Sequence, residues 1–340
     1  MSKYLKIFNG FTTFSLNMVW VSLLIIFSGC TKKVEIDPIT SSQWRVFSYL
    51  PGETQFVLYM NLNELRKTEF WESYIEHSLK QNRKNTGELD ISDWLTEFEE
   101  QSGVGLNDGV SEVYISSTWM GKNIIAVTFD KNFEKVSNYF KSSNRFEKIR
   151  KGDKEIFAGK LNISADFYFP SDSLLLIIND DDYIDKLMGE NIKSIKDNKK
   201  LMGIIKKIRS KKHYWMATDK GNYAAELLER LFSVNRELRG RNFINSIEGI
   251  SLSAEFKEGI NIESLWSCSS SKDAYLLAAA IQTALSMDLF KNETTYLGKL
   301  LDKIEIDRND SQIDFHIEIS KNDIEEIKSL AKKDLIQNKL

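Results

Sequence analysis

The chain of 340 residues is poor in the side chains that form disulfides and metal sites, with only two cysteines and three histidines. The histidines, His77, His213 and His316, lie far apart, and none stands at metal-ligand spacing from another histidine, a cysteine or a carboxylate motif. We therefore expect no metal site and no cofactor. If Cys30 is consumed by processing, Cys268 has no partner for a disulfide, and the fold must rest on its hydrophobic core.

An excess of positive charge is also missing. Lysine and arginine number 46 against 49 aspartates and glutamates, which gives a formal net charge of -3. Residues 1–29 contain two lysines and no acid, so a chain that begins at Cys30 would carry about -5. Because binding to phosphate backbones needs a concentrated positive field, nucleic acid is not expected as a partner. The composition, with 42% apolar and 28% charged residues, is that of a globular protein with one large or two medium domains.

The N-terminal apolar run is short for a membrane-spanning helix. It extends from Met18 to Phe27, whereas a spanning helix needs about twenty predominantly apolar residues. Extending the run back to Ile7 adds several polar residues. Lys3 and Lys6 precede it, and small residues follow. A positive segment, a short apolar segment and small residues are the parts of a secretory signal peptide, which we assign to residues 1–29.

The end of this run, Phe27-Ser28-Gly29-Cys30, resembles the lipobox of bacterial lipoproteins: an apolar residue, two small residues and a cysteine. In that family the thiol receives a diacylglyceryl group, a signal peptidase cuts before the cysteine, and the new amine is acylated, as with palmitate. The resemblance implies cleavage between Gly29 and Cys30 and lipidation of Cys30. A thiol is the natural nucleophile for thioether formation. Phe27 departs from the usual leucine, and an uncleaved anchor or ordinary secretion are the alternatives.

Such an anchor would place the protein in the cell envelope, facing the periplasm, and the outer membrane is the expected location in a cell with two membranes. Each buried methylene contributes about 0.8 kcal/mol, so two or more acyl chains give stable attachment. Residues 30–43 contain proline, serine and threonine without a sustained period, and we interpret them as a lipidated tether. The folded body is expected to begin at Trp44.

From Trp44 onward, strand and helix patterns follow one another. Alternating apolar residues predict strands, and an apolar stripe at helical spacing predicts helices. The predicted strands and hairpins cover residues 54–62, 111–130, 145–159, 213–219, 249–268 and 303–320, and the predicted helices cover 65–79, 132–140, 222–232, 271–289 and a last helix capped by Ser320 with Asp323 three residues on.

These patterns predict an α+β fold in which antiparallel, hairpin-rich sheets are covered by helices. The order strand, helix, hairpin, helix, hairpin occurs in residues 44–190 and again in 191–340, with a polar boundary at 189–200. Two similar halves produced by duplication would explain this order, and so would a shared α+β pattern.

Three segments of the body, "YLPGETQFVLYMNL", "IEGISLSAEFKEGINIESLWSCSSSKDAYLL" and "KIEIDRNDSQIDFHIEIS", resemble segments of bacterial envelope proteins grouped as a periplasmic domain of unknown function. In that group an opening Pro-Ala/Gly-Asp/Glu-Thr precedes a strand, and a glycine-turn hairpin leads into an Asp-Ala helix. The resemblance implies an exported α+β protein and supplies no catalytic residues.

Most residues whose side chains could take part in catalysis or metal binding are better explained by a structural role. Cys268 falls on the apolar face of its strand and is expected to be a buried thiol. The histidines are expected at the surface. In "NDDDYIDKLM" (179–188), Asn179 or Asp180 is expected to cap a helix, because the spacing lacks the pattern of a calcium loop.

Two further motifs are also given structural explanations. The basic cluster "KKIRSKKHYW" (206–215) could contact anionic headgroups. Isoleucines at helical spacing indicate instead that its basic residues are the solvated side of a helix. "GVGLNDG" (103–109) fits no dinucleotide or phosphate-binding motif and is expected to be a loop before a strand.

The sequence therefore predicts a lipid-anchored envelope protein that binds or scaffolds another envelope protein, with the membrane as its second partner. No catalytic residue is assigned. The alternative is a lipid-anchored hydrolase whose site is assembled from scattered residues such as Asp180, Asp182, His213 and Cys268.

Overall fold

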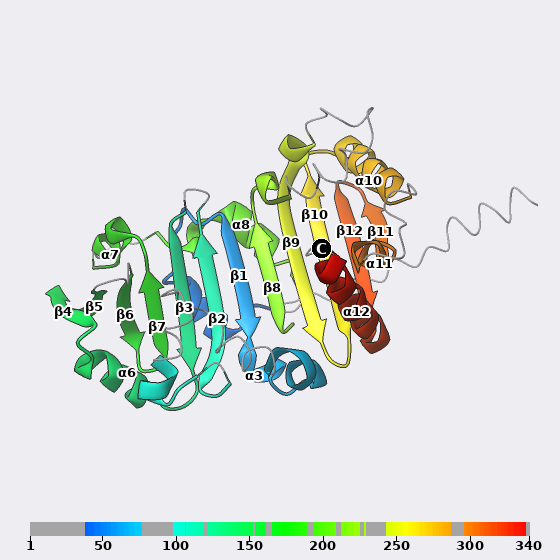
Figure 1. Cartoon of the computed structure of the whole chain (residues 1–340). Helices are drawn as coiled ribbons and strands as arrows, with labels where there is room; N and C mark the ends of the chain where they lie inside the picture. The colour runs from blue at the N-terminus through cyan, green and yellow to red at the C-terminus, as the bar shows by residue number, and fades with distance from the viewer. Residues whose placement is uncertain are drawn as a thin grey trace, which may run out of the picture. The chain divides into compact units, whose positions relative to one another are not determined.

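Antiparallel pairing of consecutive hairpins produces one continuous sheet. The computed structural model describes residues 38–76, 98–105, 107–118, 121–151, 154–160, 165–188, 193–208, 212–224, 228, 243–286 and 296–337. Within these residues, twelve strands form the sheet in the order β11-β12-β10-β9-β8-β1-β2-β3-β7-β6-β5-β4 (Figure 1). Each neighbouring pair is antiparallel. The predicted α+β class is confirmed.

The strands are β1 (Phe56–Asn61), β2 (Val110–Ser117), β3 (Asn123–Phe129), β4 (Phe146–Lys151), β5 (Lys154–Gly159), β6 (Asp166–Ser171), β7 (Leu174–Ile178), β8 (Tyr214–Thr218), β9 (Ile247–Phe256), β10 (Ile260–Cys268), β11 (Ile304–Asn309) and β12 (Gln312–Ile319). The α-helices are α2 (Ser41–Phe47), α3 (Leu62–Leu65), α6 (Phe133–Ser142), α7 (Asp181–Met188), α8 (Lys199–Ile205), α10 (Ser271–Ser286), α11 (Tyr296–Leu301) and α12 (Lys321–Gln337). Shorter helical turns are η1 (Trp71–Glu76), η2 (Ile195–Asp197), η3 (Gly221–Ala224) and η4 (Ile244–Ser246).

Every predicted hairpin is present, but one further hairpin, β6 and β7, was not predicted. The run Leu174–Ile178 is apolar at every position, because β7 lies between β3 and β6 and is covered on both faces. Such a run lacks the alternation by which a half-exposed strand is recognised. The predicted helix over 65–79 is interrupted, since α3 ends at Leu65 and η1 begins at Trp71.

The tether assigned to residues 30–43 is too long, because helix α2 begins at Ser41. Thr40 caps this helix: its Oγ1 accepts a hydrogen bond from the Gln43 amide at 3.2 Å, and Gln43 Oε1 accepts one from the Thr40 amide at 2.9 Å. The Gln43 side chain is fully buried. This reciprocal pair satisfies amides that a helix start leaves unpaired. The folded body therefore begins before Trp44.

The predicted boundary near residue 190 does not divide the sheet. Strand β8 pairs with β1 over five residue pairs, from Phe56 opposite Thr218 to Met60 opposite Tyr214. The described residues on both sides of this boundary belong to one compact unit. One hydrophobic cluster also includes both Phe47 and Leu201, which lie on opposite sides of the boundary in sequence.

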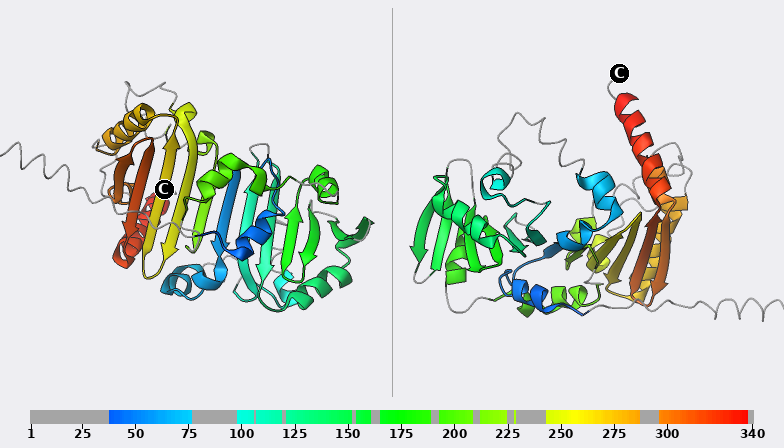
Figure 2. Two further views of the ribbon diagram at one scale, coloured as in Figure 1. Left: turned by 180° about the vertical axis from the view of Figure 1, so that it is seen from behind. Right: turned by 90° about the horizontal axis from the view of Figure 1, so that it is seen from below.

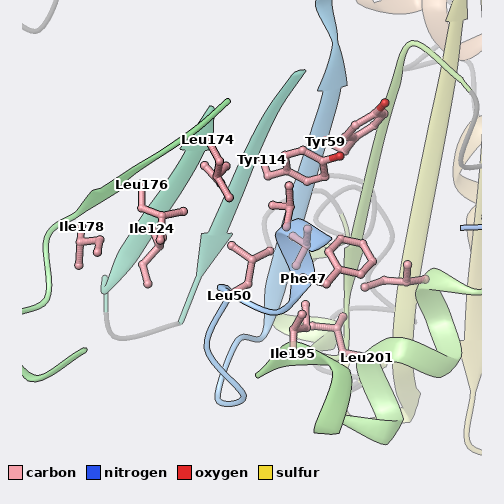
Figure 3. Packing of buried hydrophobic residues seen from close by; sticks show 14 of the residues in the cluster. Phe47, Leu50, Tyr59, Tyr114, Ile124, Leu174, Leu176, Ile178, Ile195 and Leu201 are labelled. Carbon is pink, nitrogen blue, oxygen red and sulfur yellow. The ribbon is translucent and has the colours of Figure 1, made fainter. Parts of the chain in front are cut away.

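Hydrophobic clusters lie on both faces of the sheet. On one face, α2 and α8 cover the central strands (Figure 2), with Phe47 and Leu50 packed among Tyr59, Tyr114 and Leu201 (Figure 3). On the other face α6 packs on an aromatic cluster, and α10 packs on β10 and β12. The sheet is therefore covered by helices, as the sequence predicts, although only over part of its surface.

Helix α12 has the predicted cap. The Ser320 amide donates to Asp323 Oδ2 at 2.9 Å, and the Asp323 amide donates to Ser320 Oγ at 3.2 Å. Hydrogen bonds from Ser320 and then from Lys303 lower the pKa of Asp323 to about 2. The helix start thus depends on an ionised carboxylate.

Replacing Ser320 by alanine is expected to lower the free energy of unfolding by about 1 kcal/mol, because one orphan amide loses its partner. The folded pKa of Asp323 lies below that of an unfolded aspartate, so its contribution is complete above about pH 4 and is lost as the pH falls toward 2. Urea titrations of both proteins at pH 7 and pH 3 measure this. The cap would be contradicted if the two proteins differed in free energy of unfolding by the same amount at both pH values. It would also be contradicted if Ser320→Ala lost no more stability than Ser329→Ala, a change later in the same helix.

Candidate binding site

A polar cavity lies at one end of the central strands. In an antiparallel sheet, the end of β1, the start of β2, the end of β3 and the start of β7 meet at the same edge. Residues of these segments, together with α2 and α3, line a cavity of about 240 Å³ that is open to solvent on one side. The cavity is lined by Ser42, Arg45, Asn61, Asn63, Glu64, Ser111, Glu112, Thr128, Phe129, Asp130 and Ser173.

A β-bulge shapes the wall of this cavity. In the pairing of β2 with β3, Val110 stands opposite Phe129 and Glu112 stands opposite Thr128, so Ser111 is the additional residue. The bulge allows Val110 to enter the aromatic cluster on one face while Glu112 lies on the other face. The Glu112 amide donates to Thr128 Oγ1 at 3.0 Å, which replaces a ladder bond.

The half-buried carboxylate of Glu112 is held by three hydroxyl groups. Tyr59 donates to Oε1 at 2.8 Å, and Tyr114 and Ser42 donate to Oε2 at 3.0 and 3.1 Å. Burial, followed by the negative charge of Glu112, raises the pKa of both tyrosines well above the ordinary value. Both phenols therefore stay protonated and act as donors, so the carboxylate is fixed in position.

The other charged groups of the cavity have partners of their own. Glu64 pairs with Lys67 at 2.7 Å, and Asp130 accepts a hydrogen bond from Asn63. Arg45 is exposed and its Nη2 donates to Ser173 Oγ at 3.3 Å. Two of these partners, Asn63 and Ser173, line the cavity themselves, whereas Lys67 lies outside it.

Beside the cavity, Arg66 closes the α3 turn. It donates to the Val110 carbonyl at 2.8 Å and to Asn63 Oδ1 at 2.6 Å. Burial lowers the pKa of Arg66, an effect opposed by Asp130 and Asp108. Arg66 thereby connects α3 with the bulged start of β2 and supports the cavity wall.

The cavity residues were not selected from the sequence. The available signal is weak: Glu112 alternates with Tyr114 and Ser116 in β2, so a charged side chain lies on a face that is otherwise buried. Nothing in the local pattern indicates that Ser42, which is seventy positions away, contacts it. This contact depends on the docking of α2 on the sheet.

Cys268 lies where the sequence predicts. It is 4% exposed and packs in a cluster with Trp266 and residues of α10. Burial, and then the charges of Asp273 and Glu248, raise the pKa of its thiol to about 11. A thiol with this pKa is a weak nucleophile at neutral pH, which agrees with a packing role.

The histidines differ from one another. His316 lies on the polar face of the sheet, opposite Glu263 and Glu305, and so points outward as predicted, although it is half-buried and not fully exposed. His213 is half-buried rather than at the surface, which corrects the prediction, and its Nδ1 accepts a hydrogen bond from the Phe256 amide at 2.8 Å. Its pKa is lowered by burial, although Glu255 and Glu64 oppose this. His77 lies outside the described residues.

The acidic segment serves as a helix start. Helix α7 begins at Asp181, and the Tyr183 and Ile184 amides donate to the Asp180 carbonyl at 3.0 and 3.3 Å. The Asp180 and Asp182 carboxylates pair with Lys122 at 3.0 and 3.5 Å. Within the described residues, no group of three or more histidine, cysteine or acidic side chains could hold a metal ion.

The glycine-rich loop agrees with the prediction, and the basic cluster agrees in part. Ile204, Ile205 and Ile208 are buried and Lys206 and Lys207 are exposed. These two lysines, however, follow the end of α8 at Ile205, and Lys212 is half-buried in an ion pair with Glu255. Arg209 and Lys211 lie outside the described residues. The described residues of 103–109, which exclude Leu106, form a loop that ends where β2 begins.

The four residues considered for a hydrolase do not form one site. Asp180 and Asp182 follow β7, which is four strand steps from β8, or roughly 19 Å at about 4.8 Å per step. His213 precedes β8, and Cys268 lies at the opposite end of the β8–β10 ladder, roughly 20 Å away at about 3.4 Å per residue.

Gly29 and Cys30 lie outside the described residues, so cleavage and lipidation stay predictions. As for membrane-spanning segments, the part of the chain that the structure describes contains no helix with the length and apolar character needed to cross a bilayer.

No protein-family model and no curated protein matches the sequence. Two solved structures of a protein named TP0453 are similar to this chain. Crystal form I has a TM-score of 0.43 and 10% sequence identity, and the match covers 88% of this chain and 99% of that one. Crystal form IV has a TM-score of 0.42 and 7% identity, with 84% and 94% covered. Likeness at this level says nothing about function.

Proposed function

We propose that this chain is a lipid-anchored protein of the bacterial cell envelope that binds another envelope component and does not catalyse a reaction. The observation that carries the proposal is the sequence of the N-terminus. Two lysines, a ten-residue apolar run and Phe27-Ser28-Gly29-Cys30 occur in the order that resembles a lipoprotein signal. The acidic balance of the remaining chain suits a role away from nucleic acid.

The described residues support binding through the cavity at the end of β1, β2 and β3. A carboxylate fixed by three hydroxyls is arranged for recognition, because it is held in place before a ligand arrives. Two of the residues considered for a hydrolase, Asp180 and Cys268, are used for an ion pair and for packing. The partner is an envelope component that reaches a protein held at the membrane.

The anchor is tested by expressing the full-length chain with its natural N-terminus in a bacterium. We expect the N-terminal peptide, analysed by mass spectrometry, to begin at Cys30 and to carry a diacylglyceryl group and an acyl chain. We also expect the protein in the membrane fraction, resistant to high salt and released by detergent, because several acyl chains give stable attachment. Cys30→Ser should abolish both properties.

Cys268→Ser is the matched control, since it makes the same change at the buried thiol and should leave processing unaltered. A peptide that begins at Met1, or a Cys30→Ser protein that fractionates like the natural one, would contradict the lipoprotein proposal. Proteins that co-purify with the natural chain but not with Cys30→Ser then identify the envelope partner.

We also propose that the two halves of the body arose by duplication. In support, β1 and β8, the first strands of the two halves, are antiparallel neighbours at the centre of the sheet. The third strands, β3 and β10, are each followed by a helix, and the last strands, β7 and β12, return to pair with β3 and β10. Helices α6 and α10 pack on the same face. The β4–β5–β6 segment would be an addition to the first half. A crystal structure in which equivalent strands do not superpose would contradict this proposal.

A further inference from the structure

The cavity contains a carboxylate that lacks a cationic partner. Among the described residues, no lysine, arginine or histidine nitrogen lies within 4.0 Å of Glu112, whose hydrogen-bond donors are three neutral hydroxyls. A carboxylate offers about four acceptor positions, so one is still available. Partly buried charges are normally paired, which makes Glu112 an incomplete ion pair at the wall of a cavity.

A second polar group in the same wall is also unsatisfied. Ser111 is 4% exposed, its Oγ has no hydrogen-bond partner, and it belongs to the bulge that lines the cavity. Buried hydroxyls are almost always hydrogen-bonded, so such a group in a native structure calls for a partner. The Oγ atom is itself buried, so this hydroxyl belongs to the packing of the bulge behind the cavity wall and is not assigned to a ligand.

The charges around the cavity indicate the chemistry of that ligand. Glu64 pairs with Lys67, and both Glu64 and Asp130 are exposed, so Glu112 is the half-buried carboxylate of the lining. Arg45 is exposed, its partner among the described residues is the neutral Ser173, and it provides positive charge in the same lining. One fixed carboxylate and one guanidinium are complementary to a molecule that carries both signs of charge.

The volume limits the size of the ligand. About 240 Å³ is smaller than the cavities that accept drug-sized molecules, which begin at roughly 300 Å³. A molecule with a few carbon atoms between its charged groups fits this limit, whereas a peptide or a sugar chain would have to extend out of the cavity.

We propose that the cavity binds a small amino-acid-like zwitterion, with its ammonium group paired with Glu112 and its carboxylate with Arg45. This inference rests on the binding role proposed above, and it names the ligand class. The Tyr59 and Tyr114 hydroxyls keep the Glu112 carboxylate in place. The site recognises the pair of charges and not the side chain of an amino acid.

The test is isothermal titration calorimetry of the purified full-length protein in detergent. The probes are glycine, β-alanine, 4-aminobutyrate and 6-aminohexanoate, which differ only in the separation of the two charges, together with butylammonium and butyrate. At least one zwitterion is expected to bind about tenfold more tightly than both single-charge probes. No binding by any zwitterion up to about 10 mM, or equal binding of butyrate, would overturn the proposal.

Two variants test the assigned residues. Glu112→Gln keeps the size of the side chain but removes the charge, and it should lower the affinity for the zwitterion about tenfold or more. Arg45→Gln changes an exposed side chain without risk to the core. It should lower the affinity for the zwitterion while leaving the affinity for butylammonium unchanged. Glu318→Gln, an exposed position on β12, is the matched control and should bind as the natural protein does.

Unchanged zwitterion affinity in either Glu112→Gln or Arg45→Gln would overturn the assignment. The outcome is separate from that of the anchor test, because calorimetry does not depend on where the protein is held. A lipidated chain that binds no zwitterion would leave the envelope proposal standing and remove only the ligand class.

Discussion

Replacing Phe140 by alanine is expected to lower the free energy of unfolding by about 3–5 kcal/mol. Phe140 is 1% exposed and lies at the centre of the aromatic cluster under α6. Its ring centroid is 4.5 Å from that of Phe146 and 4.9 Å from that of Phe167. Truncation removes buried apolar area and leaves a cavity that rigid neighbouring rings cannot fill.

Chemical denaturation measures the effect. Phe140→Leu keeps most of the volume and should cost markedly less than Phe140→Ala. Ile149→Ala is the second control, since Ile149 is 37% exposed on the edge strand β4 and its truncation should cost little. If Phe140→Ala and Ile149→Ala lose the same stability, the cluster does not form the core of this half of the sheet.

Replacing Trp215 by alanine is expected to have a comparable effect, about 3–5 kcal/mol, and to disturb the cavity as well. Trp215 is fully buried on β8, stacks on Tyr59 with centroids 5.2 Å apart, and meets Phe47 edge-on at 6.3 Å. Because Tyr59 donates to Glu112, loss of the stack frees a side chain that positions the carboxylate.

The indole Nε1 of Trp215 is buried without a hydrogen-bond partner, so Trp215→Phe removes an unsatisfied donor and should cost much less than Trp215→Ala. Trp44→Ala, at a half-buried tryptophan in α2 beside the same cluster, is the control for the loss of an indole. Denaturation and zwitterion titration are measured on each variant. A Trp215→Ala protein as stable as Trp44→Ala would contradict the central role of Trp215.

Local patterns predicted the elements whose residue types alternate between apolar and polar. The alternation in residues 249–268 predicted β9 and β10 because one face of that hairpin is apolar and packs against α10, while the other carries polar residues such as Ser251 and Ser253, although these serines are buried too. The Ser320 and Asp323 pair predicted the start of α12 because a cap is made by residues three positions apart. The burial of Cys268 followed from the same alternation.

Local patterns failed where burial is complete or where contacts are distant in sequence. Strand β7 was missed because both of its faces are covered. The first three residues of helix α2, 41–43, were assigned to the tether because the helix is stabilised by the packing of Phe47 on Tyr114 and Trp215, which no nearby residue reveals. The half-burial of His213 arises from its contact with Phe256 on the neighbouring strand.

The sequence by itself determined the α+β class and most of the hairpins, and it is the sole basis for the predicted lipidation at Cys30, because each of these depends on residue types within a few positions of one another. Only the tertiary structure decided that the strands form one sheet and that Ser42, Tyr59 and Tyr114 surround Glu112. The physical reason is that a cavity is made of contacts between segments, and the register of β1 on β2 and the docking of α2 set those contacts.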